Sequence, residues 1–211
     1  MPGLRNQILR RLRDDLMDRR IKAGEVLLEK SVAARFNVSK TPAREALALL
    51  CEEGLVQLLP RRGYVVSGIT VKQVVDTFDL RLVLEGAAAE RAAKNLTDQQ
   101  IDELDRLKEH DCCGELGNLL SNRLETMRHS LIFHVVIARG SGNDMLADQI
   151  EKLLRASRRI TSIGFVYGDH ALIVDALKKR NARQARKAME EHLLSGRRAA
   201  IEALAGRSPP D

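Results

Sequence analysis

The apolar residues in the first part of the chain recur with the spacing of an α-helix. A helix is predicted over residues 6–20, because apolar positions follow at three- and four-residue steps and Gly24 ends the stretch. Its inner residues are Ile8, Leu9, Leu12 and Leu16. A second, shorter helix is predicted over residues 29–36, with inner residues Leu28, Val32, Ala33 and Phe36. The two helices form the beginning of a small helical module.

A third helix is predicted from Ser39 or Thr41, either of which suits an N-cap, to about Gly54. A turn at residues 37–38 precedes it, and Pro42 lies in the first turn, where a missing N–H costs little. The residues expected to be buried are Ala43, Ala46, Leu47 and Leu50. The helix pair with a tight turn has the order of a helix-turn-helix.

After Gly54 the pattern changes to short β-prone runs. Residues 55–59 and 64–66 are such runs, and residues 60–63 between them form a turn with Pro and Gly at its ends. The order is therefore helix, helix, turn, helix, hairpin. This order predicts a winged helix-turn-helix whose wing carries Arg61 and Arg62 at its tip.

From residue 70 to the end the pattern is helical, with breaks near residues 95–97, 113–114, 140–143, 164–168 and 180–181. Only residues 163–167 offer a further strand. An antiparallel all-α bundle of about six helices is predicted. The fold class is mainly α, with a winged helix-turn-helix domain over residues 1–70 and an all-helical domain over residues 71–211.

Composition excludes several classes of protein. No apolar run approaches the roughly 18 residues of a membrane span, and the first residues hold no apolar signal core, so a cytoplasmic protein is expected. The three cysteines, Cys51, Cys112 and Cys113, form neither a disulfide framework nor a metal-binding pair, and reduced thiols are expected.

The positive charge is concentrated at one end. Residues 1–70 hold 13 Lys and Arg against 8 Asp and Glu, a net charge of +5, whereas residues 71–211 hold 22 against 21. A small basic module beside a near-neutral one indicates nucleic acid as a partner, but charge alone favours a solvated basic surface equally.

The predicted recognition helix carries its charges opposite its buried face. Lys40 and Arg44 are four residues apart and share a face, so Arg44 can contact guanine and Lys40 guanine or phosphate. The Thr41 hydroxyl and the first helix N–H groups suit a phosphate oxygen. Alternatively, both cations only solubilise the helix.

The motifs VSKTPAREAL (residues 38–47), EGLV (53–56) and PRRGYVV (60–66) resemble the DNA-binding domain of the GntR family of bacterial transcription regulators. The resemblance covers residues 5–67. It implies that double-stranded DNA is contacted by Lys30, Lys40, Thr41, Arg44, Arg62 and Gly63. Lys40 stands where the family usually has Arg, which favours a phosphate contact there because lysine lacks the planar fork.

Two histidines have an informative spacing. His170 and His192 each lie 11 residues from Asn181, so in an antiparallel helix hairpin they stand at the same height. Two imidazoles level with each other in a core are satisfied by a divalent metal or by hydrogen bonds, and the spacing leaves both readings open.

LRLVLEGAAAERAA (residues 80–93), FHVVIARGSGN (133–143) and the histidine hairpin resemble the FCD ligand-binding domain of the FadR branch of this family, over residues 72–205. The resemblance implies a divalent metal, zinc or nickel, held by His134, His170 and His192, and an effector beside Arg81. The family's fourth ligand, an aspartate, is replaced by Ser130. Asn143 is expected to cap a helix, and His110 and His129 to lie on the surface.

The sequence therefore predicts a homodimeric regulator, in the repressor mode common in the family, that binds a palindromic operator and senses a small organic acid. Two alternatives remain. One is a metal-free FCD protein that binds a fatty acyl ligand, which Ser130 favours. The other is a metalloenzyme joined to a DNA-binding module, against which no Asp or Glu general base is expected beside the histidines.

Overall fold

The computed structural model describes residues 3–18, 20–108, 119–161 and 170–206, with only the backbone of residues 119–125. The chain divides into two compact units, Met1–Ile69 and Thr70–Asp211, which are described separately. His110, Cys112, Cys113 and the possible strand at residues 163–167 lie outside the described residues. Among those described, no helix is long and apolar enough to cross a membrane.

The first unit is built on three helices, α1 (Leu4–Met17), α2 (Glu29–Phe36) and α3 (Lys40–Glu52). α2 has the predicted bounds and ends at Asn37, whose left-handed backbone (φ +52°) makes the turn into α3. Asp15 of α1 is buried and pairs with Arg35 of α2 at 2.6 Å and with Arg20 at 2.9 Å. The pair with Arg35 links the first helix to the helix-turn-helix, and the pair with Arg20 is local to the end of α1.

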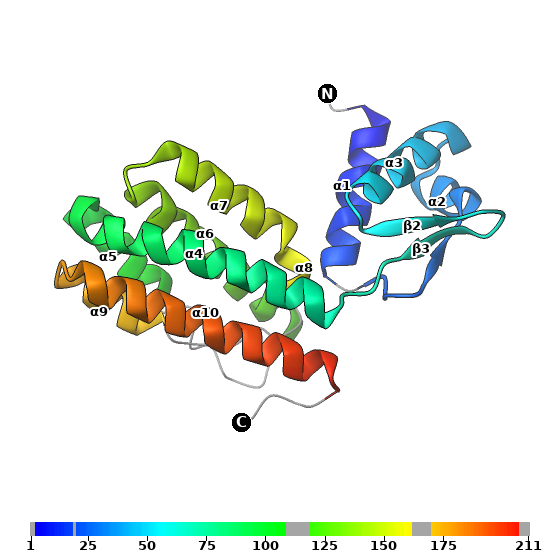
Figure 1. Ribbon diagram of the computed structural model, residues 1–211. Coiled ribbons are helices and arrows are strands. Elements are labelled where there is room, and N and C mark those ends of the chain that lie inside the picture. The colour runs from blue at the N-terminus through cyan, green and yellow to red at the C-terminus, as the bar shows by residue number, and fades with distance from the viewer. Residues whose placement is uncertain (1–2, 19, 109–118, 162–169, 207–211) are drawn as a thin grey trace. The chain divides into compact units, whose positions relative to one another are not determined.

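A three-stranded antiparallel sheet completes the unit (Figure 1). β2 (Val56–Leu59) and β3 (Gly63–Val66) form the predicted hairpin, and β1 (Val26–Leu27) pairs with the other edge of β3. β1 is not predicted by the sequence pattern, because a two-residue strand shows no periodicity. The winged helix-turn-helix is confirmed, and its core joins inner residues of all three helices to the sheet: Ile8, Leu12, Leu16, Val32, Ala43, Ala46, Leu47, Leu50, Val56 and Val66.

Two local expectations for this unit need correction. Leu28 was expected on the inner side of α2 but is 47% exposed, because it is the residue before the helix and its backbone is extended there. Ser39 does precede α3 as its N-cap, yet its side chain makes no capping hydrogen bond. The first N–H groups of α3 are therefore not satisfied by a side chain of the cap.

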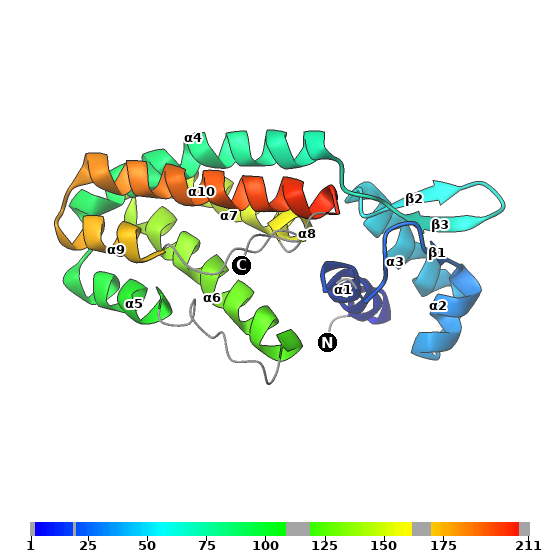
Figure 2. The same cartoon turned by 90° about the horizontal axis from the view of Figure 1, so that it is seen from below.

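The second unit is helical throughout the described residues. Its helices are α4 (Val71–Asn95), α5 (Asp98–Lys108), α6 (Leu119–Gly140), α7 (Asp144–Ala156), α8 (Arg158–Thr161), α9 (His170–Lys178) and α10 (Ala182–Leu204). The long helices α4 and α10 lie side by side and antiparallel (Figures 1 and 2). The all-α bundle is confirmed, with seven described helices where about six were predicted.

Capping residues define where the helices begin. Thr70 and Gln73 form a reciprocal capping box at the start of α4. The Asn143 side chain accepts a hydrogen bond from the Leu146 N–H at 3.1 Å and caps α7, as predicted. Asn181 does the same for α10, so α9 and α10 form a tight antiparallel hairpin. The hairpin sets the height of the histidines on both helices.

Candidate functional site

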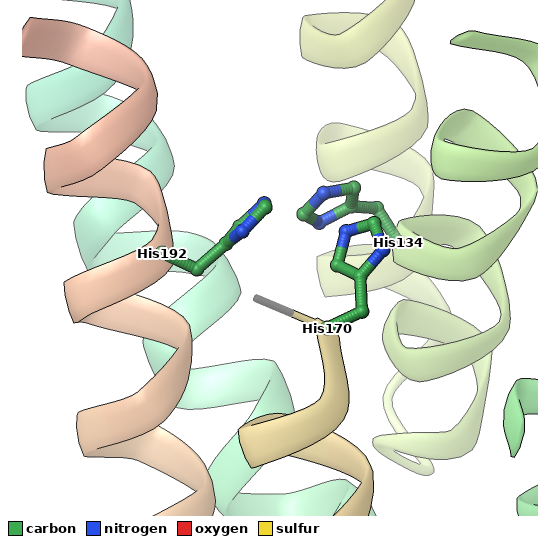
Figure 3. Close-up of side chains that lie close together, drawn as sticks. All are labelled: His134, His170 and His192. Carbon is green, nitrogen blue, oxygen red and sulfur yellow. The ribbon is translucent and has the colours of Figure 1, made fainter. Parts of the chain in front are cut away.

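Three histidines point toward one another inside the second unit (Figure 3). His134 comes from α6, His170 is the first residue of α9, and His192 comes from α10. One nitrogen from each ring lies within 4.8 Å of the others. The ring centroids of His170 and His192 are 4.6 Å apart, which agrees with the predicted level placement in the hairpin. The structure thus brings together all three histidines that the sequence singled out.

A buried carboxylate, Glu85 of α4, contacts this cluster. Its Oε2 lies 2.6 Å from Nδ1 of His134, and its Oε1 accepts a hydrogen bond from Nε of Arg81 at 2.6 Å. Glu85 and Arg81 are only 2% and 4% exposed. The sequence did not indicate that a carboxylate lies beside the histidines. The i, i+4 spacing of Arg81 and Glu85 was visible in the sequence, but it did not reveal that the pair faces inward.

Burial and the neighbouring charges favour neutral imidazoles at His134 and His192 and an ionised carboxylate at Glu85. Burial raises the pKa of Glu85, but Arg81 and His134 together outweigh it and lower that pKa to about 2. Burial lowers the pKa of His134, although Glu85 opposes the shift. Burial, with the neighbouring His170 and His134, lowers the pKa of His192 well below its usual value. Neutral imidazoles offer lone pairs, as metal ligands must.

The short contact to Glu85 also favours one tautomer of His134. An ionised carboxylate 2.6 Å from Nδ1 stabilises the form that carries its proton on Nδ1, which leaves the lone pair on Nε2. A carboxylate behind a ligating imidazole is the usual outer partner at metal sites. Three nitrogen donors with such support fit a divalent ion such as zinc, with positions left for other ligands. Ser130, one turn before His134, supplies no carboxylate ligand.

A cavity of about 200 Å³ adjoins the cluster. His134 and His192 lie in its wall, whereas His170 stacks on the Phe133 ring at a centroid distance of 4.0 Å. The other lining residues are Phe78, Arg81, Met127, Arg128, Ser130, Leu131, Leu154, Arg158, Thr161, Leu193, Ser195 and Gly196. Arg81 therefore faces the cavity and also contacts Glu85. His129, expected on the surface, is half-buried.

The predicted DNA-contacting side chains of α3 lie on one exposed face. Lys40, Thr41 and Arg44 are exposed, and the opposite face of the helix is buried in the core. Lys30 of α2 is also exposed. The arrangement leaves the cations of both helices accessible to a phosphate backbone or a base edge.

The wing residues differ from one another in their roles. Arg62 is exposed, but Gly63 is half-buried and has a positive φ of +99°. A Cβ on Gly63 would lie 2.8 Å from the backbone oxygen of Leu27. Gly63 is thus required for β3 to pair with β1, a role that the sequence alone did not indicate.

A winged helix-turn-helix joined to a helical unit with a ligand cavity defines the class of DNA-binding transcription regulators with an effector domain. Residues 4–66 match the bacterial regulatory proteins of the gntR family, and residues 76–195 match the FCD domain. The chain belongs to the GntR family and is a helix-turn-helix regulator with an FCD effector-binding domain.

Relatives at the level of sequence are regulators. The chain is 32% identical over 203 residues to the HTH-type transcriptional repressor RspR of Escherichia coli K12. The matched region covers 89% of this chain and 84% of that protein. The gluconate operon transcriptional repressor of Bacillus subtilis is 38% identical over 89 residues, 42% of this chain and 36% of that protein.

Solved structures share the fold. McbR/YncC of E. coli matches with a TM-score of 0.72 at 23% identity, over 96% of this chain and 99% of that one. A GntR regulator from Rhodococcus sp. RHA1 matches with a TM-score of 0.70 at 20% identity, over 95% and 97% of the two chains. At these identities the likeness concerns the fold alone.

Proposed function

We propose that this regulator is a repressor whose FCD domain senses a small organic acid bound in the cavity beside a divalent metal. The observation that carries the proposal is the cluster of His134, His170 and His192 at the cavity wall, supported by Glu85. The repressor mode draws on the names of RspR and the gluconate operon repressor. The effector acts through its different affinities for two states of the protein.

In this proposal the three imidazoles hold zinc or nickel, and Glu85 orients His134 through Nδ1. The bound ion supplies a positive centre for an effector carboxylate. Arg81 keeps its Nε on Glu85, and its terminal nitrogens are available for a bidentate contact with that carboxylate. Ser130 in place of the aspartate lowers the charge of the ligand set, so the ion is held less tightly than by a four-ligand site.

DNA recognition is assigned to the exposed cations of the first unit. Arg44 contacts a base edge in the major groove, and Lys40 and Thr41 contact phosphates at the start of α3. Lys30 and Arg62 contact the backbone from α2 and the wing, and Gly63 places the wing. We propose residues 1–70 as the DNA-binding domain and residues 71–211 as the effector domain.

The protein acts as a homodimer on a palindromic operator, so that two recognition helices meet successive turns of the duplex. Exposed apolar residues on α4 support an interface there: Leu80 is 48% and Val83 65% exposed, and the two share a face of the helix. Val83→Glu should convert the dimer to a monomer, as measured by light scattering. Val71 is another exposed apolar residue of α4, and Val71→Glu should leave the dimer intact.

The two alternative functions draw less support from the cavity. A volume of about 200 Å³ lies below the roughly 300–1,000 Å³ of pockets for drug-sized ligands, and it suits a small acid better than a long acyl chain. Glu85 restores a carboxylate beside the histidines, but its contacts to His134 and Arg81 occupy both oxygens. It is therefore a positioning residue and not a free general base.

Elemental analysis combined with operator binding tests the proposal. The purified protein should contain about one divalent ion for each chain and lose it to a chelator. A footprint or mobility shift on the DNA upstream of the protein's own gene should weaken when an organic acid is added. Equal metal content and equal acid response before and after chelation would sink the metal-assisted mechanism.

A further inference from the structure

The cavity is lined by three arginines and, among the described residues, by no aspartate or glutamate. The arginines are Arg81 of α4, Arg128 of α6 and Arg158 of α8. The remaining polar lining groups are the hydroxyls of Ser130, Thr161 and Ser195 together with the two histidines. A cavity with this lining attracts anions.

The charge of Arg81 is already compensated within the protein. Its Nε donates to Glu85 at 2.6 Å, and both side chains are buried. In the described part of the chain its two terminal nitrogens have no acceptor. Arg81 can therefore donate hydrogen bonds to a ligand, but the Arg81–Glu85 pair adds no net charge to the cavity.

Arg128 and Arg158 lack such compensation. Within the described ranges neither of them has a carboxylate partner; Arg158 is half-buried and Arg128 is exposed. Several other arginines of the same unit do pair with carboxylates: Arg139, Arg155, Arg180, Arg186 and Arg197. Among the described residues, no carboxylate balances these two positive charges of the cavity.

We propose that the effector carries two anionic groups, as in a short dicarboxylic acid or a phosphorylated hydroxy acid. This inference rests on the proposed function, because it takes the cavity as the effector site. One anionic group binds beside the imidazole cluster and Arg81, and the other binds Arg128 and Arg158. The hydroxyls of Ser130, Thr161 and Ser195 accept or donate the remaining hydrogen bonds of the ligand.

Calorimetric titration of the full-length protein with matched acids tests the number of charges. Succinate is compared with butyrate, and 3-phosphoglycerate with glycerate, so that each pair differs mainly by one anionic group. We expect at least one dianion to bind about tenfold or more tightly than its monoanionic match, because the second group gains charge-assisted hydrogen bonds. The pair that shows this difference distinguishes a dicarboxylate from a phosphate ester.

Substitutions test whether Arg128 and Arg158 bind the second anionic group of the effector. Arg128→Gln and Arg158→Gln should each weaken the dianion about tenfold and leave the weaker binding of the monoanion unchanged. Arg81→Gln should weaken both ligands. Arg198→Gln, on the exposed surface of α10 away from the cavity lining, is the matched control and should change neither. Thermal melting of each variant checks that the fold is retained.

The outcomes separate this inference from the proposed function. Equal affinity for monoanions and dianions, or no effect of Arg128→Gln and Arg158→Gln, overturns the two-anion proposal while acid sensing stands. If no acid of the panel binds and none changes operator binding, acid sensing itself fails and the two-anion proposal fails with it.

Discussion

Glu85 Oε2 lies 2.6 Å from His134 Nδ1, although 49 positions separate the two residues in the sequence. The contact favours the tautomer of His134 that keeps the lone pair on Nε2, the nitrogen that a metal ion would take. Because the other Glu85 oxygen is bonded to Arg81, the same carboxylate also links the histidine cluster to a cavity arginine.

Removing the charge of Glu85 should weaken metal binding. Glu85→Gln keeps the shape of the side chain but replaces the anion behind His134 with a neutral amide, and loss of such an outer partner typically costs about 10–100-fold in metal affinity. Competition with a chromophoric zinc chelator measures the change. Glu90→Gln, which removes only the ion pair to Arg186, is the control and should leave zinc affinity unchanged.

Features of the fold that depend on residues close together in the sequence could be predicted, and contacts between distant helices could not. The helices, the turn at Asn37 and the hairpin follow from apolar spacing and turn residues a few positions apart. His170 and His192 were placed level because a short hairpin joins them. Glu85 was not found, since its partner belongs to another helix and the rotation of α4 about its axis is not readable to within one residue.

The stability of the chelator-treated protein should fall on acidification. Glu85 has a lowered pKa in the folded state, about 2 against about 4.5 when unfolded, so its contribution is present above pH 4.5 and is lost as pH falls toward 2. His134 and His192 also have lowered pKa values, so the unfolded chain takes up more protons below its histidine pKa of 6.5. Protonation of each of the three groups therefore lowers the stability of the fold as the pH falls.

Two pH windows are expected from thermal melts. The melting temperature should decline first below about pH 6.5, from the histidines, and again below about pH 4.5, where Glu85 contributes up to about 3 kcal/mol. His192→Asn should flatten the first window and leave the second. A melting temperature that stays constant from pH 7 to pH 5 in the unsubstituted protein would contradict the buried neutral state of the histidines.

A methyl group at Gly63 should destabilise the DNA-binding unit. The residue has a φ of +99°, and its added Cβ would meet the Leu27 oxygen at 2.8 Å, so Gly63→Ala should cost about 1–3 kcal/mol. Gly68→Ala is the control, because its Cβ would meet nothing within 4 Å. Denaturant unfolding separates this loss of stability from a lost DNA contact: weakened DNA binding with unchanged unfolding would assign Gly63 to the interface instead.

Arg44 and Lys30 should affect DNA binding in different ways. Arg44→Ala should reduce the preference for operator over random DNA, by roughly 1–3 kcal/mol for each base pair contacted. Lys30→Ala should weaken binding to all sequences and lower the salt dependence by about one phosphate contact. Fluorescence anisotropy with both DNAs at several salt concentrations distinguishes them. Equal losses on both DNAs for Arg44→Ala would argue against base reading.

A carboxylate at residue 130 should raise the affinity for metal and lower the affinity for the effector. Ser130 lies in the cavity wall one helical turn before His134, so Ser130→Asp places an anion on the same face of α6 as that ligand. We expect zinc to bind about tenfold more tightly or better, a gain of about 1.4 kcal/mol. Ser130→Asn is the matched control, because it adds the same volume without the charge.

The same anion should oppose a ligand that carries negative charge. In the unsubstituted protein Arg128 and Arg158 have no carboxylate partner in the described part of the chain, and a carboxylate at residue 130 would compensate part of that charge from within the cavity. Ser130→Asp should therefore bind dianions more weakly than Ser130→Asn does, while its zinc affinity is higher. If the two variants bind zinc and dianions alike, then residue 130 faces neither ligand, and the ion is held by the three imidazoles without access from the cavity.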